Sequence, residues 1–443
     1  MDQYLGTIRE RPVAAQVSPG CIEEQLPREA PEDPEPLDAI LEDFEQRILA
    51  GITHWNHPRF FGYFAISGSR PGILAESLTA ALNVNGMLWR TSPAATELER
   101  RVLAWLARWM GLPERLFGII FDTASVSTLH AVLAARHVKD PGGRVGGHRP
   151  DLVVYASEQA HSSVEKAVLA LGMGQKNFRR IGVDQAFRMR VDQLESAIMA
   201  DVRAGLRPCC IVATVGTTGA TAVDPVDEVA ELAQRYGLWL HVDAAYAGMA
   251  AMLPEMRALF CGLERADSLV VNPHKWLFTP MDCSVLYTRR PEVLREALSL
   301  TPDYLQTDDE AVNLMDYGIP LGRRFRALKL WFIMRAFGRR RTTEILRNHI
   351  AWAKALAERI EQDERFELAA PVLFSLVCFR LRGAEERTQE LLERINRGGF
   401  ALLSPVVLHG KLAIRFAIGN IHTTWQDVEA TWEAISRAAE SRA

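Results

Sequence analysis

Short apolar runs alternate with helical patterns along the middle of the chain, from about residue 118 to about residue 290. The apolar runs are four to seven residues long and rich in β-branched residues, which is typical of buried strands. We predict strands at Gly118–Phe121, Asp151–Ala156, Cys209–Val215, Leu238–Val242, Ser268–Val271 and Ser284–Thr288. Helical spacing lies between several of them, as in Ser162–Leu171 and Val191–Ala204. This alternation predicts an α/β fold with a mostly parallel central sheet and helices on both faces.

The pattern changes in the last third of the chain. Helical spacing covers Arg323–Phe337 and Thr342–Gln362, and strands and helices alternate again in the tail. There we predict strands Leu373–Leu381, Ala401–Val407 and Leu412–Ile418, a helix Glu385–Ile395, and a last helix to near Ala439. The tail therefore predicts a small C-terminal α+β domain behind the large one.

The first 35 residues are rich in proline and acidic residues, which predicts an extended arm because proline fixes φ and restricts the residue before it. A helical pattern follows at Leu37–Ile48. An arm with an amphipathic helix but no core needs a surface, and a second copy of the chain is one candidate. We predict three parts: an arm with helices that pack on the partner subunit (1–85), a large domain (86–345) and a small domain (346–443).

Composition excludes several classes of protein. The 443 residues carry a net charge of −4 and a pI near 6.3, which does not favour binding to nucleic acid or to an anionic membrane. Six scattered cysteines form no CxxC motif and no Cys/His cluster with zinc-site spacing, so we expect no metal site and a reducing compartment. The first residues lack a signal-peptide pattern, and no apolar stretch has membrane-spanning length. We expect a cytoplasmic protein.

The segment Asn272–Trp276, directly after the predicted strand Ser268–Val271, contains a lysine at a strand end. A buried ammonium is costly unless its charge is neutralised or used, and Lys275 in that position could act as a Schiff-base nucleophile with a lowered pKa. Taken alone, an ordinary surface lysine explains the segment more simply.

A second segment, His241–Tyr246, places Asp243 at the end of the very apolar strand Leu238–Val242. A carboxylate there needs a cationic partner, and a pyridinium nitrogen is one. An ion pair with an arginine, or a cap on the next helix, would satisfy the same carboxylate.

A third segment, Phe121–Ser127, lies between a predicted strand and the following helix. Small hydroxyl residues at a helix start expose backbone N–H groups, and the helix dipole favours a phosphate there. Ordinary helix capping also accounts for it. The segment is not a Walker A loop, and no GxGxxG follows a strand, so nucleotide binding is disfavoured.

Together, the three segments supply a Schiff-base lysine, an acid for a ring nitrogen and a phosphate cradle at the strand ends of one sheet. These are the requirements of a single cofactor, pyridoxal 5′-phosphate. The segment Ala213–Gly219 adds hydroxyl groups, among them Thr218, after another strand. His161 starts a helix after the strand Asp151–Ala156 and so belongs to the same edge, although a lone histidine there is more often a helix cap.

At these residues the chain resembles the group II pyridoxal-phosphate-dependent decarboxylases, and most closely their aromatic-L-amino-acid decarboxylase branch. The resemblance runs nearly from end to end. It is carried by Arg11–Val13, His54–Phe64, Ser92–Glu99, the His161 segment, His241–Gly248, Asn272–Trp276 and Ile319–Arg326. Each piece alone is weak, but the combination is specific to the family.

The resemblance implies the fold type I architecture of pyridoxal-phosphate-dependent transferases and a homodimer with its two sites at the subunit interface. It implies that Lys275 binds the cofactor covalently, that Asp243 contacts the pyridine nitrogen and that His161 stacks on the ring. The remaining cofactor contacts it implies are Ala124, Ser125, Thr218, Asn272 and His274. The substrate would be an L-amino acid, aromatic by default, in a pocket shaped by Trp55, Tyr63, Phe64, Ile66, Asn85 and Met87.

The implied reaction is decarboxylation to the amine and CO₂, which requires a proton at Cα. In the family a tyrosine on a mobile loop shortly before the Ile319–Arg326 segment is credited with this proton, but the chain has Leu314 at that position, and leucine cannot donate. Relatives with phenylalanine there react with oxygen and produce an aldehyde. Three outcomes follow: Tyr317 or His161 acts as the acid, the enzyme forms an aldehyde, or its activity is low. Asp122 and Val126 also replace the family's usual glycine and glutamate.

Overall fold

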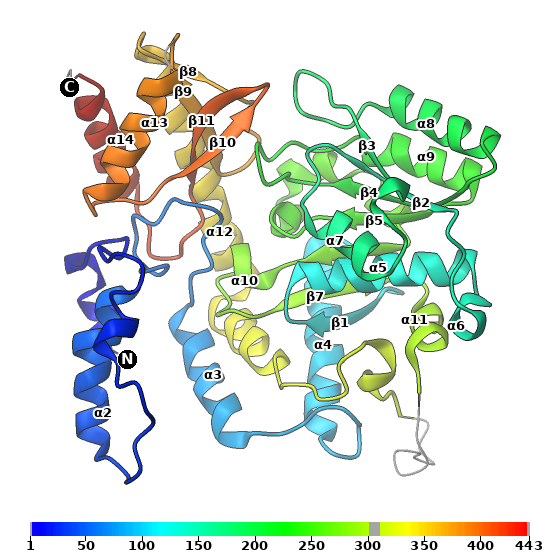
Figure 1. Cartoon of the computed structure of the whole chain (residues 1–443), viewed down its shortest axis with the longest axis horizontal. Helices are drawn as coiled ribbons and strands as arrows, with labels where there is room; N and C mark the ends of the chain where they lie inside the picture. Colours follow the sequence, from blue (N-terminus) through cyan, green and yellow to red (C-terminus); the bar gives the residue numbers. More distant parts are fainter. Residues whose placement is uncertain (1, 301–310, 384, 441–443) are drawn as a thin grey trace. The chain divides into compact units, whose positions relative to one another are not determined.

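The computed structural model of the chain describes residues 2–300, 311–383 and 385–440 (Figure 1). These residues form two compact units. One unit comprises Met1–Ala65, Trp352–Ala369 and Val377–Ala443, and the other comprises Ile66–Ala351 and Ala370–Leu376. The division into arm, large domain and small domain at residues 85 and 345 remains a prediction.

The unit that contains Ile66–Ala351 is built on a seven-stranded sheet with the strand order β1-β7-β6-β5-β4-β2-β3. The strands are β1 (Phe117–Phe121), β2 (Leu152–Ser157), β3 (Phe178–Ile181), β4 (Arg207–Thr214), β5 (Trp239–Asp243), β6 (Ser268–Val271) and β7 (Ser284–Thr288). β7 is antiparallel to both of its neighbours, and the pairs from β6 through β3 are all parallel. The predicted fold class is therefore confirmed, and the six predicted strands are present.

Helices cover both faces of this sheet (Figure 1). The principal helices are α3 (Arg70–Leu82), α4 (Pro93–Met110), α5 (Ala124–Lys139), α7 (Ser163–Ala170), α8 (Val191–Arg203), α9 (Val226–Tyr236) and α11 (Pro291–Leu298). Along β2, Val154 belongs to the core that includes α5 residues, whereas the next side chain, Tyr155, donates a hydrogen bond to Asp201 of α8 at 2.8 Å. Because successive strand residues point to opposite faces, α5 and α8 lie on opposite sides of the sheet.

The long helix α12 runs over Ala327–Gln362 and is interrupted at Gly338, whose φ of 61° is not helical. Two helices separated near this position were predicted, and the structure joins them through one glycine in a conformation that other residues rarely adopt. Within the described ranges, no helix combines the length and the apolar character needed to cross a membrane.

The other unit contains a four-stranded antiparallel sheet with the order β10-β11-β9-β8. Its strands are β8 (Phe366–Leu368), β9 (Leu376–Leu381), β10 (Ser404–Leu408) and β11 (Lys411–Ala417). The helix α13 (Glu385–Arg397) packs against β10 and β11, and α14 (Trp425–Glu440) packs against α13 (Figure 1). The predicted small α+β arrangement is present, with β8 as an additional strand.

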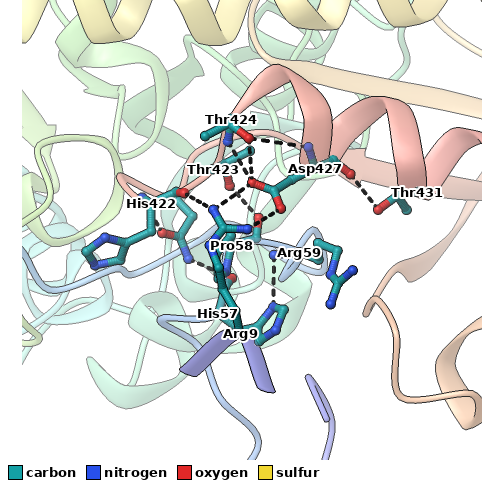
Figure 2. A network of polar contacts seen from close by, with 10 residues as sticks. Arg9, His57, Pro58, Arg59, His422, Thr423, Thr424, Asp427 and Thr431 are labelled. Atoms are coloured by element: carbon teal, nitrogen blue, oxygen red, sulfur yellow. Dashed lines mark hydrogen bonds and ion pairs between the residues drawn. The ribbon is translucent and has the colours of Figure 1, made fainter. Parts of the chain in front are cut away.

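The N-terminal segment of the same unit is held to the start of α14 by a network of polar contacts (Figure 2). The Arg9 guanidinium donates to both carboxylate oxygens of Asp427, at 2.6 and 3.0 Å. Thr424 donates its backbone N–H and its hydroxyl to the same carboxylate at 2.9 and 2.8 Å. Burial raises the pKa of Asp427, but the hydrogen bonds from Arg9 and Thr424 together outweigh burial, so the pKa is lowered. The proline-rich arm therefore begins with an ordered attachment to its own chain.

One buried ion pair connects α4, β1 and the Ile319–Arg326 segment. Glu99 Oε1 accepts from Arg323 Nη2 at 2.7 Å and from the backbone N–H of Ile120 at 2.8 Å, and both side chains of the pair are less than 8% exposed. The pair supports the strand whose end forms the candidate phosphate site.

We expect Glu99→Ala to lower the free energy of unfolding by about 3–5 kcal/mol, because it leaves the Arg323 charge buried and unpaired. Urea denaturation at neutral pH measures this loss. The exposed pair Arg341–Glu344 offers a matched control, and Glu344→Ala should cost less than about 1 kcal/mol. Equal losses in the two variants would show that the buried pair has no special role.

Candidate active site

The carboxyl ends of the parallel strands bring the predicted cofactor residues to one edge of the sheet. Asp243 ends β5 and pairs in register with Thr214 at the end of β4 and with Val270 near the end of β6. Neighbouring strands are about 4.8 Å apart, so the segments that follow β4, β5 and β6 start within one small region. Ligands bind at this edge in open α/β sheets.

Lys275 lies on α10 (Pro273–Trp276), the single helical turn that follows β6. Its backbone N–H donates to the carbonyl of Asn272 at 2.9 Å, and its side chain is half-buried. The neighbouring Trp276 is fully buried; its indole stacks on Tyr246 at 4.9 Å and donates to Nδ1 of His349 at 3.0 Å. The turn that carries the lysine is thus fixed by packing behind it, which limits the positions that the lysine amine can reach.

Asp243 is 5% exposed, and one of its carboxylate oxygens accepts from the backbone N–H of Ala245 at 3.0 Å. His241 precedes it on the same face of β5 and is also buried. Burial lowers the pKa of His241 to about 4, against the opposing effect of Asp243, so the imidazole is neutral at physiological pH and does not neutralise the carboxylate. Asp243 is therefore a buried anion suited to a cationic ligand group.

His161 lies between β2 and α7 and faces the same region. The backbone N–H of Ser163 donates to its Nδ1 at 3.2 Å, so Nδ1 is an acceptor and the neutral ring carries its proton on Nε2. The surrounding protein lowers its pKa by removing water; the positive charges of Lys275 and Lys166 add to this effect, and Asp243 opposes it. His161, Asp243 and Lys275 are therefore close enough to influence one another electrostatically.

His274 precedes the lysine and is 4% exposed. Burial, with Lys275 as the next contribution, lowers the pKa of His274 to about 3. Its Nδ1 accepts from the backbone N–H of Cys283 at 3.0 Å, which leaves the single ring proton on Nε2. A neutral histidine with a fixed tautomer presents one N–H donor, as an anionic ligand requires.

The α5 helix begins at Ala124, and its cap residue Thr123 makes no side-chain capping bond. The Thr123 carbonyl accepts from Val126 and Ser127 at 3.1 Å, which leaves the N–H groups of Ala124 and Ser125 at the open end of the helix. The Asp122 carboxylate accepts from the N–H of Thr123 at 2.6 Å, so this unusual acid is engaged with the local backbone. Thr218 is exposed in the turn after β4.

These features fit pyridoxal 5′-phosphate in three respects. A buried carboxylate is available for a protonated ring nitrogen, a helix start and the His274 Nε2–H are available for a phosphate, and a half-buried lysine is available for the aldehyde. The buried Oδ1 of Asn272 also has no hydrogen-bond partner among the described residues, although Asn272 is only 2% exposed. An unpaired buried acceptor of this kind indicates a missing donor.

Asn85 and Met87 lie beside the segment that carries Leu314. The Met87 carbonyl accepts from the N–H of Met315 at 3.2 Å, and Asn85 Oδ1 accepts from the N–H of Arg323 at 2.9 Å. Leu314 itself is 1% exposed and begins a short 3-10 turn, Leu314–Tyr317. Ile66 is half-buried at the start of this unit.

The Tyr317 ring stacks on Phe117 at 4.6 Å. Phe117 is the first residue of β1, and the strand extends about 13 Å from there to its carboxyl end. The phenol is therefore packed at the opposite end of the strand from the candidate phosphate site, and burial raises its pKa. This position disfavours Tyr317 as the proton donor.

The remaining predicted pocket residues, Trp55, Tyr63 and Phe64, belong to the other compact unit. Trp55 stacks on Tyr63 at 5.6 Å, and the Arg415 guanidinium lies 4.9 Å from the centre of the Phe64 ring. Tyr63 is 57% exposed and has a φ of 51°, a left-handed conformation that non-glycine residues rarely adopt. The Ser404 hydroxyl and Arg415 hold its backbone N–H and carbonyl, at 3.0 and 3.1 Å.

Sequence reasoning did not identify His130, which connects α5 to the end of the Leu314 segment. Its Nδ1–H donates to the Val126 carbonyl at 2.7 Å, its Nε2 accepts from the N–H of Ile319 at 3.0 Å, and its ring stacks on Phe121 at 4.1 Å. The one feature of the sequence that could have identified His130 is that a histidine stands at a core position of an otherwise apolar helix. Burial lowers its pKa to about 4; Asp122 opposes the shift and Arg323 adds to it.

We expect His130 to destabilise the protein in mild acid. The unfolded histidine takes up a proton near pH 6.5 but the folded one only near pH 4, so the unfolding free energy falls as pH decreases between these values and levels off below them. From pH 7 to pH 5 the loss is about 2 kcal/mol.

In His130→Gln the amide oxygen can still accept from the backbone N–H of Ile319, but glutamine does not titrate. We therefore expect the variant to lack the loss of unfolding free energy that His130 causes between pH 7 and pH 5. Urea unfolding at pH 7 and pH 5 compares the two proteins. His409→Gln, at an exposed histidine, provides the control and should keep the wild-type slope. A wild-type slope in His130→Gln would be the contrary result.

The chain is clearly related to known enzymes. Residues 19–382 match the family described as "Pyridoxal-dependent decarboxylase conserved domain". The chain is 41% identical to tyrosine decarboxylase 4 of Petroselinum crispum, over 99% of this chain and 91% of that protein. It is also 41% identical to a phenylacetaldehyde synthase of Arabidopsis thaliana, over 98% and 93%. The crystal structure of Oryza sativa TDC with PLP and tryptamine superposes with a TM-score of 0.96 at 36% identity, covering 99% of this chain and 95% of that one.

Fold and family therefore agree on the class of protein: a pyridoxal-phosphate-dependent enzyme of the α/β type predicted from the sequence. The chain belongs to the pyridoxal-dependent decarboxylase family, and it is a pyridoxal-phosphate-dependent amino-acid decarboxylase.

Proposed function

We propose that the protein decarboxylates an aromatic L-amino acid to the corresponding amine and CO₂. The observation that carries this proposal is that Lys275 follows β6 and Asp243 ends β5, next to each other at the carboxyl edge of the sheet, with His161 after β2 close enough for both charges to act on its ring. The names of the similar proteins refer to tyrosine, phenylacetaldehyde and tryptamine, which supports an aromatic side chain in the substrate.

The proposed roles follow from the geometry of the chain. Lys275 would bind the aldehyde carbon of the cofactor through Nζ, Asp243 would hold a proton on the ring nitrogen, and His161 would contact the ring. The phosphate is held by the N–H groups of Ala124 and Ser125 and by His274 Nε2–H, with Asn272 and Thr218 as further polar contacts. When bound, pyridoxal 5′-phosphate supplies a ring that accepts the electron pair released as the bond from Cα to the carboxylate breaks.

The chain's own groups then decide the outcome at Cα. Asp243 favours the reaction because a fixed buried anion stabilises the positive ring nitrogen without reorganisation. His161 is the candidate donor for Cα in place of a loop tyrosine: with both ring nitrogens protonated it would release the Nε2 proton to Cα and return to a neutral ring. We propose that Trp55, Tyr63, Phe64, Ile66, Asn85 and Met87 shape the substrate pocket.

Assays with the purified holoenzyme test this proposal directly. L-tryptophan, L-phenylalanine, L-tyrosine, L-DOPA and a set of non-aromatic L-amino acids are offered separately, with and without a keto acid, while CO₂, oxygen and peroxide are monitored. Amine and CO₂ in equal amounts, without oxygen uptake, are the expected result. Turnover of non-aromatic amino acids alone would refute the aromatic substrate, and amino-group exchange with a keto acid without CO₂ would refute the reaction.

A second candidate function is decarboxylation coupled to oxidation, and Leu314 favours it. The balanced reaction consumes the amino acid, O₂ and water and yields an aldehyde, CO₂, ammonia and hydrogen peroxide. A leucine that is 1% exposed at the loop position supplies no proton, and Tyr317 is packed elsewhere. Oxygen uptake equal to CO₂ release, with peroxide formed, would establish this second activity.

We also propose a cytoplasmic homodimer. Four apolar side chains in and after α2 (Leu37–Asp43) are strongly exposed, namely Leu37 (76%), Ile40 (48%), Leu41 (58%) and Phe44 (45%). An amphipathic helix that exposes such a face favours association. Light scattering should give twice the mass of the chain, and the double variant Leu41→Glu with Phe44→Glu should shift the measured mass toward that of the monomer.

The proposed cytoplasmic location is supported by the six free cysteines, which favour a reducing compartment.

A further inference from the structure

A cavity of about 410 Å³ lies at the edge of the seven-stranded sheet opposite the candidate active site. It forms where β4 and β5 begin, where β7 ends, and beside the last residues of α5 and α9. Trp239 lines the cavity at the start of β5, whereas Asp243 ends the same strand about 13 Å away. The cavity is therefore distinct from the cofactor site.

Positive charge dominates the lining of this cavity. Lys139, Arg265, Arg289 and Arg290 face a single acidic residue, Asp267. The Asp267 carboxylate accepts from the backbone N–H of Leu240 at 2.9 Å, and no ion pair within 4 Å joins it to these cations in the described chain. Burial raises the pKa of Asp267, and the charges of Arg290 and Arg289 oppose this shift, so the single acid offsets part of their charge and the lining keeps an excess of cationic side chains.

Three of the four cations have structural roles of their own. Arg265 is paired with Asp227 at 2.8 Å, and the Arg290 guanidinium lies 5.4 Å from the centre of the Trp239 ring, near Glu292 at 3.8 Å. Lys139 is in the last turn of α5, where a cation favours the helix dipole.

Helix capping does not account for Arg289, which follows β7. The Nε atom of Arg289 is buried and has no hydrogen-bond partner in the described part of the chain. The Arg289 guanidinium also forms no ion pair within 4 Å with a described residue. Because no described residue neutralises this guanidinium through an ion pair, an anion in the cavity could supply the missing charge. Arginine is also well suited to phosphate and carboxylate groups because its donors form a planar fork.

Apart from Gln234, most of the other lining residues are apolar. Val138 of α5, Ala230 and Ala233 of α9, and Trp239 contribute, and the volume lies within the range of small-molecule sites. We propose that this cavity binds a small organic anion, with its phosphate or carboxylate group at Arg289 and Lys139 and its apolar part against Trp239 and α9. Such a ligand would bind at the amino end of the strand whose carboxyl end carries Asp243.

Isothermal titration of the holoenzyme tests the site, with the cofactor phosphate position filled. The probes are phenyl phosphate, benzoate and, as a cationic analogue, benzylamine. We expect one saturable site for an anionic probe, weakened at least about tenfold by Lys139→Gln with Arg289→Gln, and by added salt. The stronger anionic probe identifies the preferred group.

The surface pair Arg340→Gln with Arg341→Gln removes the same charge elsewhere and should leave binding unchanged. Thermal melting of both double variants shows whether they are folded. Binding that survives in Lys139→Gln with Arg289→Gln, benzylamine binding as tight as that of the anions, or no saturable binding to the folded wild type would each overturn the proposal. None of these outcomes depends on the substrate or product of the proposed function.

Discussion

Replacing Lys275 by alanine should abolish both turnover and covalent attachment of the cofactor. The loss of activity should reach at least about 10³-fold, as expected when an essential nucleophile or proton-transfer group is removed. The physical reason is that Lys275 is the one amine held by the packed turn after β6, next to the buried Asp243 and the His161 ring. Absorbance of the bound cofactor, and borohydride reduction followed by peptide mass analysis, measure attachment.

A matched control separates this role from a general loss of charge. Lys354→Ala removes an exposed lysine of α12 and should leave activity and attachment intact. In the wild type, borohydride should fix the cofactor on the peptide that contains Lys275. Attachment to another side chain, or an active Lys275→Ala protein, would contradict the assignment and would also require another partner for Asp243.

The proposed cofactor residues could be placed at one edge of the sheet from the sequence, because each follows a strand that is visible as an apolar run. Asp243 and Lys275 come directly after such runs, and the alternation with helices implies that parallel strands end at the same edge. The direction of β7 was not predictable in the same way, because its apolar residues resemble those of the parallel strands in the same sheet, although β7 is antiparallel to both of its neighbours. β3 was missed because Phe178–Ile181 contains two arginines in four residues.

Tertiary contacts explain what the sequence left open. Tyr317 was an equal candidate for the proton donor until its ring was found on Phe117, a contact between residues 200 positions apart. His130 likewise gains its role from Ile319, which no local pattern links to it. The cationic cavity collects Lys139 from the end of α5, Arg265 from the turn before β6 and Arg289 from the residue after β7. Such long-range pairs depend on the fold and not on local periodicity.

Leu314→Tyr should raise the proportion of amine among the products. The substitution places a phenolic donor at the loop position, and a positioned general acid contributes about 10²–10⁴-fold to a proton transfer. If the wild type forms aldehyde, we expect oxygen uptake per CO₂ released to fall at least about tenfold. If the wild type forms amine with His161 as the donor, we expect Leu314→Tyr to form amine faster. We also expect His161→Asn to slow Leu314→Tyr less than it slows the wild type.

Leu314→Phe is the control, because it introduces the same ring at the same buried position without the hydroxyl group. Any cost of overpacking should be common to the two variants, so the difference between them reports the hydroxyl alone. The measurements are product ratios by chromatography with oxygen and peroxide recorded in parallel, for both variants and for each combined with His161→Asn. Identical product ratios in Leu314→Tyr and Leu314→Phe would mean that residue 314 does not reach Cα. The proton would then have to come from His161 or from solvent, and the loop position would not decide between amine and aldehyde.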